Sequence, residues 1–346
     1  MKVLNISPIS SFGGLNFVLN ELNRLKINKI LEDYLPNLPS QSKYSWKDII
    51  YSYWSIILCG GDCAEDISHN LKPGLDNNPY IKLPSPDRLL NRLKKLSVPS
   101  KHYKKYRAKV FNEFSINQEI NILNLKILKR LSTLKTKEVI LDYDNTYLFT
   151  DKADARNTYL KNYGYCPGVG IIGNNVVYIE NRNGNCAPHT LQEETLERMF
   201  DLLDSQGIKI DVFRADSASF TFPIITTIHK YANKFYVKAR MNGAIADAIK
   251  NIKQWKEIHL GDKIIYRGST VFTPFKVAAQ KSKQQKILKE YRLVVTKEEK
   301  KDRQMDLFMG EACIYSAILT NEFDKSDDEV VFSIIKEENK SENLIY

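Results

Sequence analysis

The chain lacks the cysteine and histidine patterns that build structural zinc sites. Its five cysteines and five histidines are scattered over 346 residues, and no two cysteines form a Cys-x-x-Cys pair. A structural zinc site needs four such ligands at close spacing. Scattered cysteines of odd number also give no disulfide framework, which favours a reduced, intracellular compartment. We expect His189, His229 and His259 to be structural.

Long apolar runs are missing as well. The N-terminus, MKVLNISPISSFGG, has no signal-peptide core, and the most apolar segment, residues 49–58, is too short to span a bilayer. We therefore expect a soluble protein with no membrane partner.

Acidic residues are fewer than basic ones, with 41 Asp and Glu against 51 Lys and Arg, which gives a net charge of +10. Such an excess favours an anionic partner, most often nucleic acid.

Residues 1–135 are predicted to be mostly helical. Apolar residues recur at helical spacing after Gly14, and Ser45 and Ser85 are candidate N-caps of two further helices. Basic helices with tyrosines between the lysines are predicted from Lys101 and again up to Lys137. Two interpretations stay open for them, contact with a phosphate backbone or an ordinary solvated face.

From Val139 the hydrophobic period becomes strand-like, so we expect a domain boundary near 135–138. Residues 136–240 alternate strands with helices and predict a mixed α/β sheet. Residues 241–310 are predicted to form a β-rich insertion with basic loops, and residues 311–346 to return to the core. The final helical pattern stops without a cap or a closing element, which predicts a truncated chain.

Acidic residues at strand ends form the candidate site. Asp142 and Asp144 alternate onto one face of the first strand, where paired carboxylates are costly unless a cation or a phosphoryl group binds. Asp216 ends the fourth strand, which commonly neighbours the first in a sheet of this order. Carboxylates from separate elements are the ligands of two-metal Mg²⁺ or Mn²⁺ sites. A third acid is expected from a later helix, where Glu342 is the candidate and Glu337 and Glu338 are alternatives by spacing.

A series of motifs, in order along nearly the whole chain, resembles the DDE transposases of bacterial insertion sequences, most closely the family numbered thirteen-eighty. In the C-terminal two thirds the motifs are LDYDNT (141–146), YGYCPG (163–168), ENRNGN (180–185), FRADSASF (213–220), FYVKAR (235–240), YRLVVTK (291–297) and AILTN (317–321). FGGL (12–15), ILCGGDCAEDISH (57–69) and SPDRLLNRL (85–93) are similar to the family's helical DNA-binding region. The resemblance implies a ribonuclease H-like catalytic domain with a β-rich insertion, preceded by that helical region.

The resemblance also implies roles for individual residues. Asp144, Asp216 and Glu342 would be the catalytic acids that hold Mg²⁺ or Mn²⁺, with Asp142 as a neighbour that tunes the site. The implied reaction is hydrolysis at the element ends followed by attack of the freed 3′-hydroxyl on target DNA. The implied partners are double-stranded DNA, namely terminal inverted repeats and target, and a second copy of the chain when active, in the bacterial cytoplasm at the nucleoid.

Around Glu342 this sequence departs from the family pattern, since the expected tyrosine, arginine and lysine are missing and the sequence stops at Tyr346. An inactive remnant that binds DNA without cutting it is therefore a second prediction. Six polar residues near the strand ends are expected to contact phosphates, with solvated strand-edge charges as the alternative: Arg182, Asn183, Asn185, Arg214, Lys238 and Arg240.

A rival interpretation comes from the D-x-D-x-T spacing, which is also the nucleophile motif of haloacid dehalogenase-like phosphatases. In that case Asp142 would attack the phosphoryl group and Asp144 would act as general acid. Such an enzyme needs a later acidic pair at a strand end. The one available, Asp327-Asp328, precedes a helical pattern instead.

Overall fold

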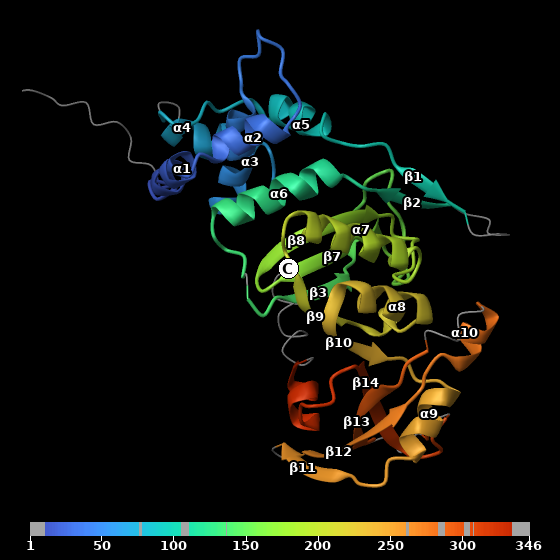
Figure 1. The fold of residues 1–346 in the computed structure, drawn as a ribbon. Coiled ribbons are helices and arrows are strands. Elements are labelled where there is room, and N and C mark those ends of the chain that lie inside the picture. Colours follow the sequence, from blue (N-terminus) through green and yellow to red (C-terminus); the bar gives the residue numbers. More distant parts are fainter. Residues whose placement is uncertain are drawn as a thin grey trace, which may run out of the picture. The chain divides into compact units, whose positions relative to one another are not determined.

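The computed structural model describes residues 11–75, 78–104, 111–135, 137–260, 263–282, 288–300, 305–306 and 308–333 (Figure 1). It divides into two compact units, residues 1–100 with 115–133 and residues 101–114 with 134–346. No helix in the described part of the chain is both long and apolar enough to cross a membrane.

The first unit is built from helices, as expected. Ser45 caps α3 through a capping box with Asp48, and Ser85 caps α5, because each side chain accepts a backbone N–H of the first turn. The helices are α1 (Leu15–Arg24), α2 (Ile27–Tyr34), α3 (Trp46–Leu58), a π-helical turn (Ile67–Leu71), α4 (Lys72–Leu75), α5 (Pro86–Lys94) and α6 (Gln118–Arg130).

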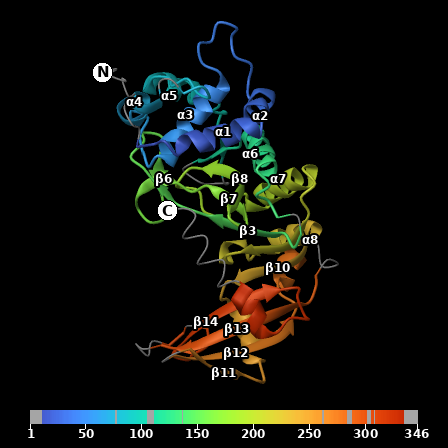
Figure 2. The ribbon, with the colours of Figure 1, turned by 90° about the vertical axis from the view of Figure 1, so that its left-hand side faces the viewer.

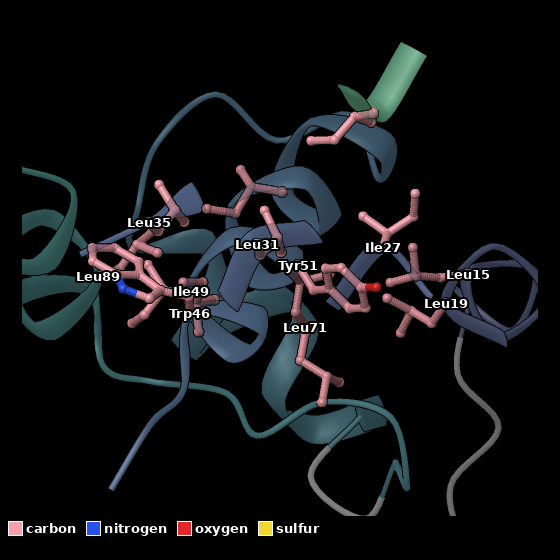
Figure 3. Packing of buried hydrophobic residues seen from close by; sticks show 14 of the residues in the cluster. Leu15, Leu19, Ile27, Leu31, Leu35, Trp46, Ile49, Tyr51, Leu71 and Leu89 are labelled. Carbon is pink, nitrogen blue, oxygen red and sulfur yellow. The ribbon is translucent and has the colours of Figure 1, made fainter. Parts of the chain in front are cut away.

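One apolar core holds these helices together. Ile27 and Leu31 of α2, Ile49 and Tyr51 of α3, and Leu89 of α5 are all fully buried within it (Figure 3). Packing of one apolar face is how an amphipathic helix gains most of its stability. The face expected for α3 from spacing is buried only in part, because Ile57 and Leu58 at its end are exposed.

In the described part of the basic segment from Lys101, the chain forms strands where a helix was predicted, so that prediction was wrong for these residues. Lys101–Tyr103 and Asn112–Ser115 are strands β1 and β2, paired antiparallel with Lys101 opposite Phe114. The lysines and tyrosines gave a helical period, but β2 instead continues the sheet of the second unit beside β8. Pairing in the sheet overrode local propensity, as it does for many short segments.

The second unit contains an eleven-stranded sheet in the order β1-β2-β8-β7-β3-β9-β10-β14-β13-β12-β11. Its central strands are β3 (Ile140–Asn145), β7 (Gly168–Ile172), β8 (Asn175–Arg182), β9 (Ile210–Ala215) and β10 (Ala232–Ala239). β7 is antiparallel to β3 and β8 is antiparallel to β7, whereas β9 is parallel to β3 and β10 is parallel to β9. This order and these directions are those of a ribonuclease H-like domain, so the predicted fold class is confirmed.

Helices cover the two faces of this sheet differently. α7 (Gln192–Ser205) and α8 (Phe222–Tyr231) lie against one face, where Phe200 of α7 contacts Phe213 and His229 of α8 contacts Phe235 (Figure 1). Residues 327–333 form a helix against the opposite face. Its Val330 and Val331 are buried in a cluster with Tyr236, Val294 and Ile318.

The predicted β-rich insertion extends the same sheet instead of forming a sheet of its own (Figure 2). β14 pairs antiparallel with β10, with Tyr236 opposite Thr320. The elements within residues 241–310 are α9 (Gly243–Lys250), β11 (Lys256–Leu260), β12 (Lys263–Phe272), α10 (Lys276–Lys281) and β13 (Tyr291–Glu299). β14 (Cys313–Thr320) belongs to the predicted return to the core. A small second sheet, β4 (Leu148–Phe149), β6 (Tyr163–Tyr165) and β5 (Arg156–Asn157), lies between β3 and β7 in the sequence.

Candidate active site

The sheet brings Asp144 and Asp216 side by side. Asp142 of β3 is opposite Arg214 of β9, and the next pair is Tyr143 with Ala215. Asp144 and Asp216 occupy the positions directly after that pair, on neighbouring parallel strands. Since side chains alternate across a strand, both acids share the face of Asp142 and Arg214. Lys238 follows on β10 one strand further, because Val237 pairs with Ala215.

The pKa values of both acids are raised, and Asp216 contributes to the shift of Asp144. Burial and the negative charge of Asp216 raise the pKa of the Asp144 carboxyl to about 6, while the N–H of Asn145 and the charge of Lys238 oppose this rise. The pKa of Asp216 is also raised, chiefly by desolvation, against the N–H of Ala218 and the charges of Lys238 and Arg240. A buried carboxyl whose ionisation is opposed by a neighbouring carboxylate forms a site that a cation stabilises.

Asp142 has a different role from Asp144. Its carboxylate accepts two hydrogen bonds from the Arg214 guanidinium, from Nε at 2.5 Å and from Nη2 at 2.6 Å. Arg214 also donates to the backbone oxygen of Ser333, in the helix on the same face. Both residues are buried. Arg214 is therefore a buried structural ion-pair partner, and we replace its expected phosphate contact with this role.

Asp142 in this pair is poorly suited to attack a phosphorus atom, because both of its oxygens are engaged. The chain after Asp144 also enters the small sheet of β4, β5 and β6. The geometry thus disfavours the phosphatase interpretation.

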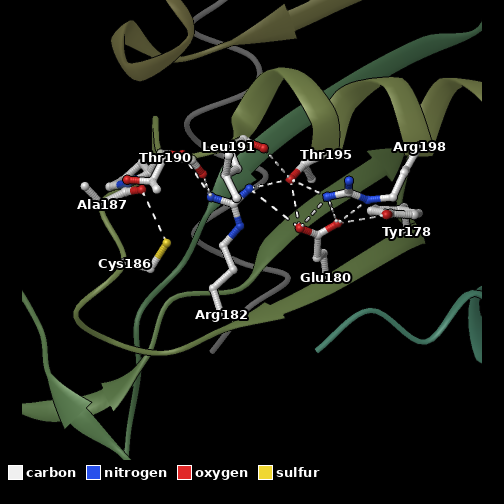
Figure 4. Close-up of polar contacts among 10 residues, drawn as sticks. Tyr178, Glu180, Arg182, Cys186, Ala187, Thr190, Leu191, Thr195 and Arg198 are labelled. Atoms are coloured by element: carbon white, nitrogen blue, oxygen red, sulfur yellow. Dashed lines mark hydrogen bonds and ion pairs between the residues drawn. The ribbon is translucent and has the colours of Figure 1, made fainter. Parts of the chain in front are cut away.

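Arg182 is also structural. Its side chain is fully buried and donates to the carbonyls of Pro188 and Thr190 and to the Thr195 hydroxyl (Figure 4). Close by, the buried Glu180 accepts from Arg198, Thr195 and Tyr178. A guanidinium with no exposed surface offers nothing to a phosphate. The expected DNA contact of Arg182 is therefore corrected to a buried ion cluster that fixes the chain after β8.

The Asn183-Gly184-Asn185 turn packs closely on the small sheet. The Asn183 amide donates to Glu113 and to the carbonyl of Asp154, so this buried residue is structural rather than a DNA contact. A Cβ on Gly184 would lie 2.4 Å from the carbonyl oxygens of Arg156 and Gly164. Only glycine fits there. Asn185 is partly exposed, and its Nδ2 donates to the carbonyl of Phe111.

A pocket of about 630 Å³ opens directly beside Asp216. The small sheet contributes Tyr147 and the turn 157–159, and the turn after β8 contributes residues 184–189, with Asn185 among them. Arg240 completes the wall beside Asp216. Of the six expected DNA contacts, Asn185 and Arg240 line this pocket and Lys238 lies beside the acids. The other three, Arg182, Asn183 and Arg214, are buried in structural contacts. Sequence reasoning missed the tyrosines and Thr158, because nothing in the sequence indicated that the small sheet borders the acids.

The described residues supply two of the three expected acids. Glu342, like Glu337 and Glu338, lies outside the described residues. Two carboxylates from adjacent strands fit a hard cation such as Mg²⁺, because their oxygens are the donors it prefers. Within the described residues, a cluster of three potential ligands occurs at Asp62, Cys63 and Asp66, an exposed turn in which Asp66 accepts the N–H groups of Asp62 and Cys63.

Comparisons with known proteins gave structural matches only. No protein-family model matches the chain, and no curated protein matches it. A cryo-EM structure of the piggyBac transposase synaptic complex with hairpin DNA aligns with 13% identity and a TM-score of 0.40, over 98% of this chain and 67% of that chain.

Two Mos1 transposase structures align less well. The paired-end complex with the left transposon end has 14% identity and a TM-score of 0.23, over 62% of this chain and 74% of that one. The strand transfer complex has 13% identity and a TM-score of 0.22, over 65% and 76%. Scores this low establish neither fold nor activity, and the fold assignment rests on the strand order alone.

Proposed function

We propose that the protein is a DNA transposase of the DDE type, which cleaves phosphodiesters at element ends and joins the freed 3′-hydroxyl to target DNA. The observation that carries the proposal is the adjacency of Asp144 and Asp216 at neighbouring strand ends of a ribonuclease H-like sheet. Their raised pKa values support it, because functional carboxylates are often perturbed by burial and by a like charge.

In this proposal Asp144 and Asp216 hold Mg²⁺ or Mn²⁺ together with an acid from residues 334–346, for which Glu342 is the candidate. The metal would activate the attacking oxygen and stabilise the leaving oxygen of the phosphodiester. Asp142 and Arg214 keep β3 and β9 in register below the acids, and Arg214 also holds the helix of residues 327–333 on their face.

DNA reaches this site as an anion. The charges of Lys238, near the end of β10, and Arg240, just after it, act on Asp216 and would favour phosphate binding there. The net charge of +10 favours DNA binding generally. Since an element has two ends, we propose that the active form contains two copies of the chain.

The test is cleavage of labelled duplexes that carry the sequences flanking the gene. Wild-type protein is expected to cut with Mg²⁺ or Mn²⁺ and not with Ca²⁺. Asp144→Asn and Asp216→Asn should each lose at least about 100-fold in rate, in line with the cost of removing one catalytic electrostatic group. Asp204→Asn, an exposed acid on α7, is the matched control and should cut normally.

Cleavage that survives Asp216→Asn would refute the proposal. Binding of these duplexes without any cleavage under all metal conditions would instead identify the chain as the non-catalytic remnant.

A further inference from the structure

The turn that carries Asp216 has a defined hydrogen-bond pattern. Asp216 follows β9 and caps the short turn of residues 217–219, since its carboxylate accepts the backbone N–H of Ala218 at 3.0 Å. The backbone N–H of Ser219 donates to the carbonyl of Asp216 at 3.2 Å. The conformation of this turn therefore determines where the Asp216 carboxylate lies relative to Asp144.

The Ser219 side chain connects this turn to helix α7. Ser219 is fully buried, and its Oγ accepts a hydrogen bond of 2.6 Å from the Nε2 of Gln192, the first residue of α7. α7 covers the face of the sheet opposite to the acids, where its Phe200 contacts Phe213. Gln192 is only 1% exposed, so this contact is shielded from bulk water.

The buried Arg182 cluster fixes the position of Gln192. Arg182 donates to the carbonyl of Thr190, two residues before Gln192, and to the hydroxyl of Thr195, three residues after it (Figure 4). The start of α7 is thus held on both sides of Gln192. This arrangement gives the Gln192 amide a defined direction toward Ser219.

The other end of the Gln192 amide costs stability. Its Oε1 is buried and has no hydrogen-bond partner within the described part of the chain. A buried amide oxygen without a partner is unfavourable, and an apolar side chain of similar size would avoid that cost. A role of the Nε2 end in holding Ser219 accounts for a glutamine at this position.

We propose that Gln192 is a positioning residue for Asp216. By holding Ser219, it keeps the turn of residues 217–219 in the conformation in which Asp216 and Asp144 bind one divalent cation together. Hydrogen-bonded groups that orient metal ligands typically contribute about 10–100-fold to metal affinity. This inference rests on the proposed function, because it assumes that the two acids hold a metal ion.

The experiment measures the affinity of the full chain for Mn²⁺ in the absence of DNA, from the electron paramagnetic resonance signal of the free ion. Binding at the acids is the part of the titration that Asp216→Asn removes. Gln192→Met keeps the approximate size of the side chain and removes its amide. We expect it to weaken Mn²⁺ binding at the acids by about tenfold.

The double variant Gln192→Met/Ser219→Ala separates positioning from folding. It removes both partners of the hydrogen bond and also the unpartnered oxygen, so its metal-free stability should stay close to that of the wild type. Urea unfolding in EDTA measures this stability. Its Mn²⁺ affinity should equal that of Gln192→Met, because the two side chains act through one contact. A merely structural contact would instead change stability and leave the Mn²⁺ affinity unchanged.

Two substitutions serve as matched controls. Gln206→Met changes the glutamine at the other end of α7. Ser55→Ala removes a buried serine hydroxyl that donates to the carbonyl of Tyr51 within α3. Both controls should bind Mn²⁺ at the acids with the affinity of the wild type.

Wild-type Mn²⁺ affinity in Gln192→Met and in the double variant would overturn this inference and leave the proposed function intact. So would losses from Gln192→Met and Ser219→Ala that add up in the double variant, because the two residues would then act independently. If Asp216→Asn removes no Mn²⁺ binding from the wild type, the inference and the proposed function fail together.

Discussion

Asp142 and Asp144 are two residues apart on one face of β3, yet they have different charged neighbours. Asp142 is neutralised by Arg214, whereas Asp144 has another acid as its neighbour. A buried pair such as Asp142–Arg214 adds little net stability, but removing one partner leaves an uncompensated buried charge. The pair therefore fixes the register of the strands. Asp144 has no such ion pair among the described residues, and its pKa is raised by burial and by the charge of Asp216.

The raised pKa of Asp144 predicts how the stability of the protein depends on pH. Ionised Asp144 is disfavoured in the folded protein, because its pKa is raised from 3.8 to about 6. The metal-free wild type should therefore lose stability as pH rises from about 4 to about 6, with the penalty complete above pH 6. Asp144→Asn removes the charge and should stabilise the metal-free protein at pH 7.5, by at most about 3 kcal/mol.

Urea unfolding in EDTA at pH 4 and at pH 7.5 measures this effect. The gain from Asp144→Asn should be present at pH 7.5 and largely absent at pH 4. A loss of stability at pH 7.5 would show that Asp144 is favourably paired in the metal-free fold.

At the scale of elements, the turn after β8 controls the position of the pocket. Gly184 approaches the backbone of Arg156 and Gly164 too closely for any side chain. Gly184→Ala should destabilise the protein by about 1–3 kcal/mol, the usual cost of overpacking. Thermal unfolding measures this effect.

Gly243 is the matched control for this substitution. It begins α9, a Cβ added there would meet nothing within 4 Å, and its φ is not positive. Gly243→Ala should be neutral or slightly stabilising, because alanine restricts the unfolded chain. Equal destabilisation by the two substitutions would contradict the close-packing argument.

Periodicity and strand-end acids were enough to predict the central elements. The strands at 140–145, 210–215 and 232–239 and the helices at 192–205 and 222–231 are present, and β9 neighbours β3 as expected. The burial of polar residues could not be predicted, because the sequence does not reveal that Glu180 pairs with both Arg182 and Arg198. Arg182 and Arg240 look alike in sequence, and only tertiary packing separates a buried cluster from an exposed contact.

At the scale of the whole molecule, charge should govern DNA binding. With a net charge of +10, the affinity should fall steeply and linearly with the logarithm of salt concentration. Arg240→Gln should reduce the magnitude of this slope by about 1, because it removes one phosphate contact. Filter binding over a range of salt concentrations gives the slope.

Lys230→Gln is the control for this experiment. Lys230 is exposed on α8, on the face of the sheet opposite to the acids, and pairs with Glu197. Its replacement should leave the slope unchanged. If both substitutions reduced the slope equally, DNA would be attracted by the overall positive charge of the protein and not by a contact of Arg240 beside Asp144 and Asp216.

The pairing of β10 with β14 has a consequence for synthesis of the chain. Asp144, Asp216 and Lys238 all precede residue 240, whereas β14 and the helix of residues 327–333 are made much later. A ribosome-bound chain of intermediate length thus has both carboxylates before the helix of residues 327–333 is made. The edge of β10 that later pairs with β14 is open at that stage. Such unpaired edges and exposed apolar faces are what chaperones bind. We expect a ribosome-associated chaperone to bind nascent chains between completion of β10 and emergence of β14.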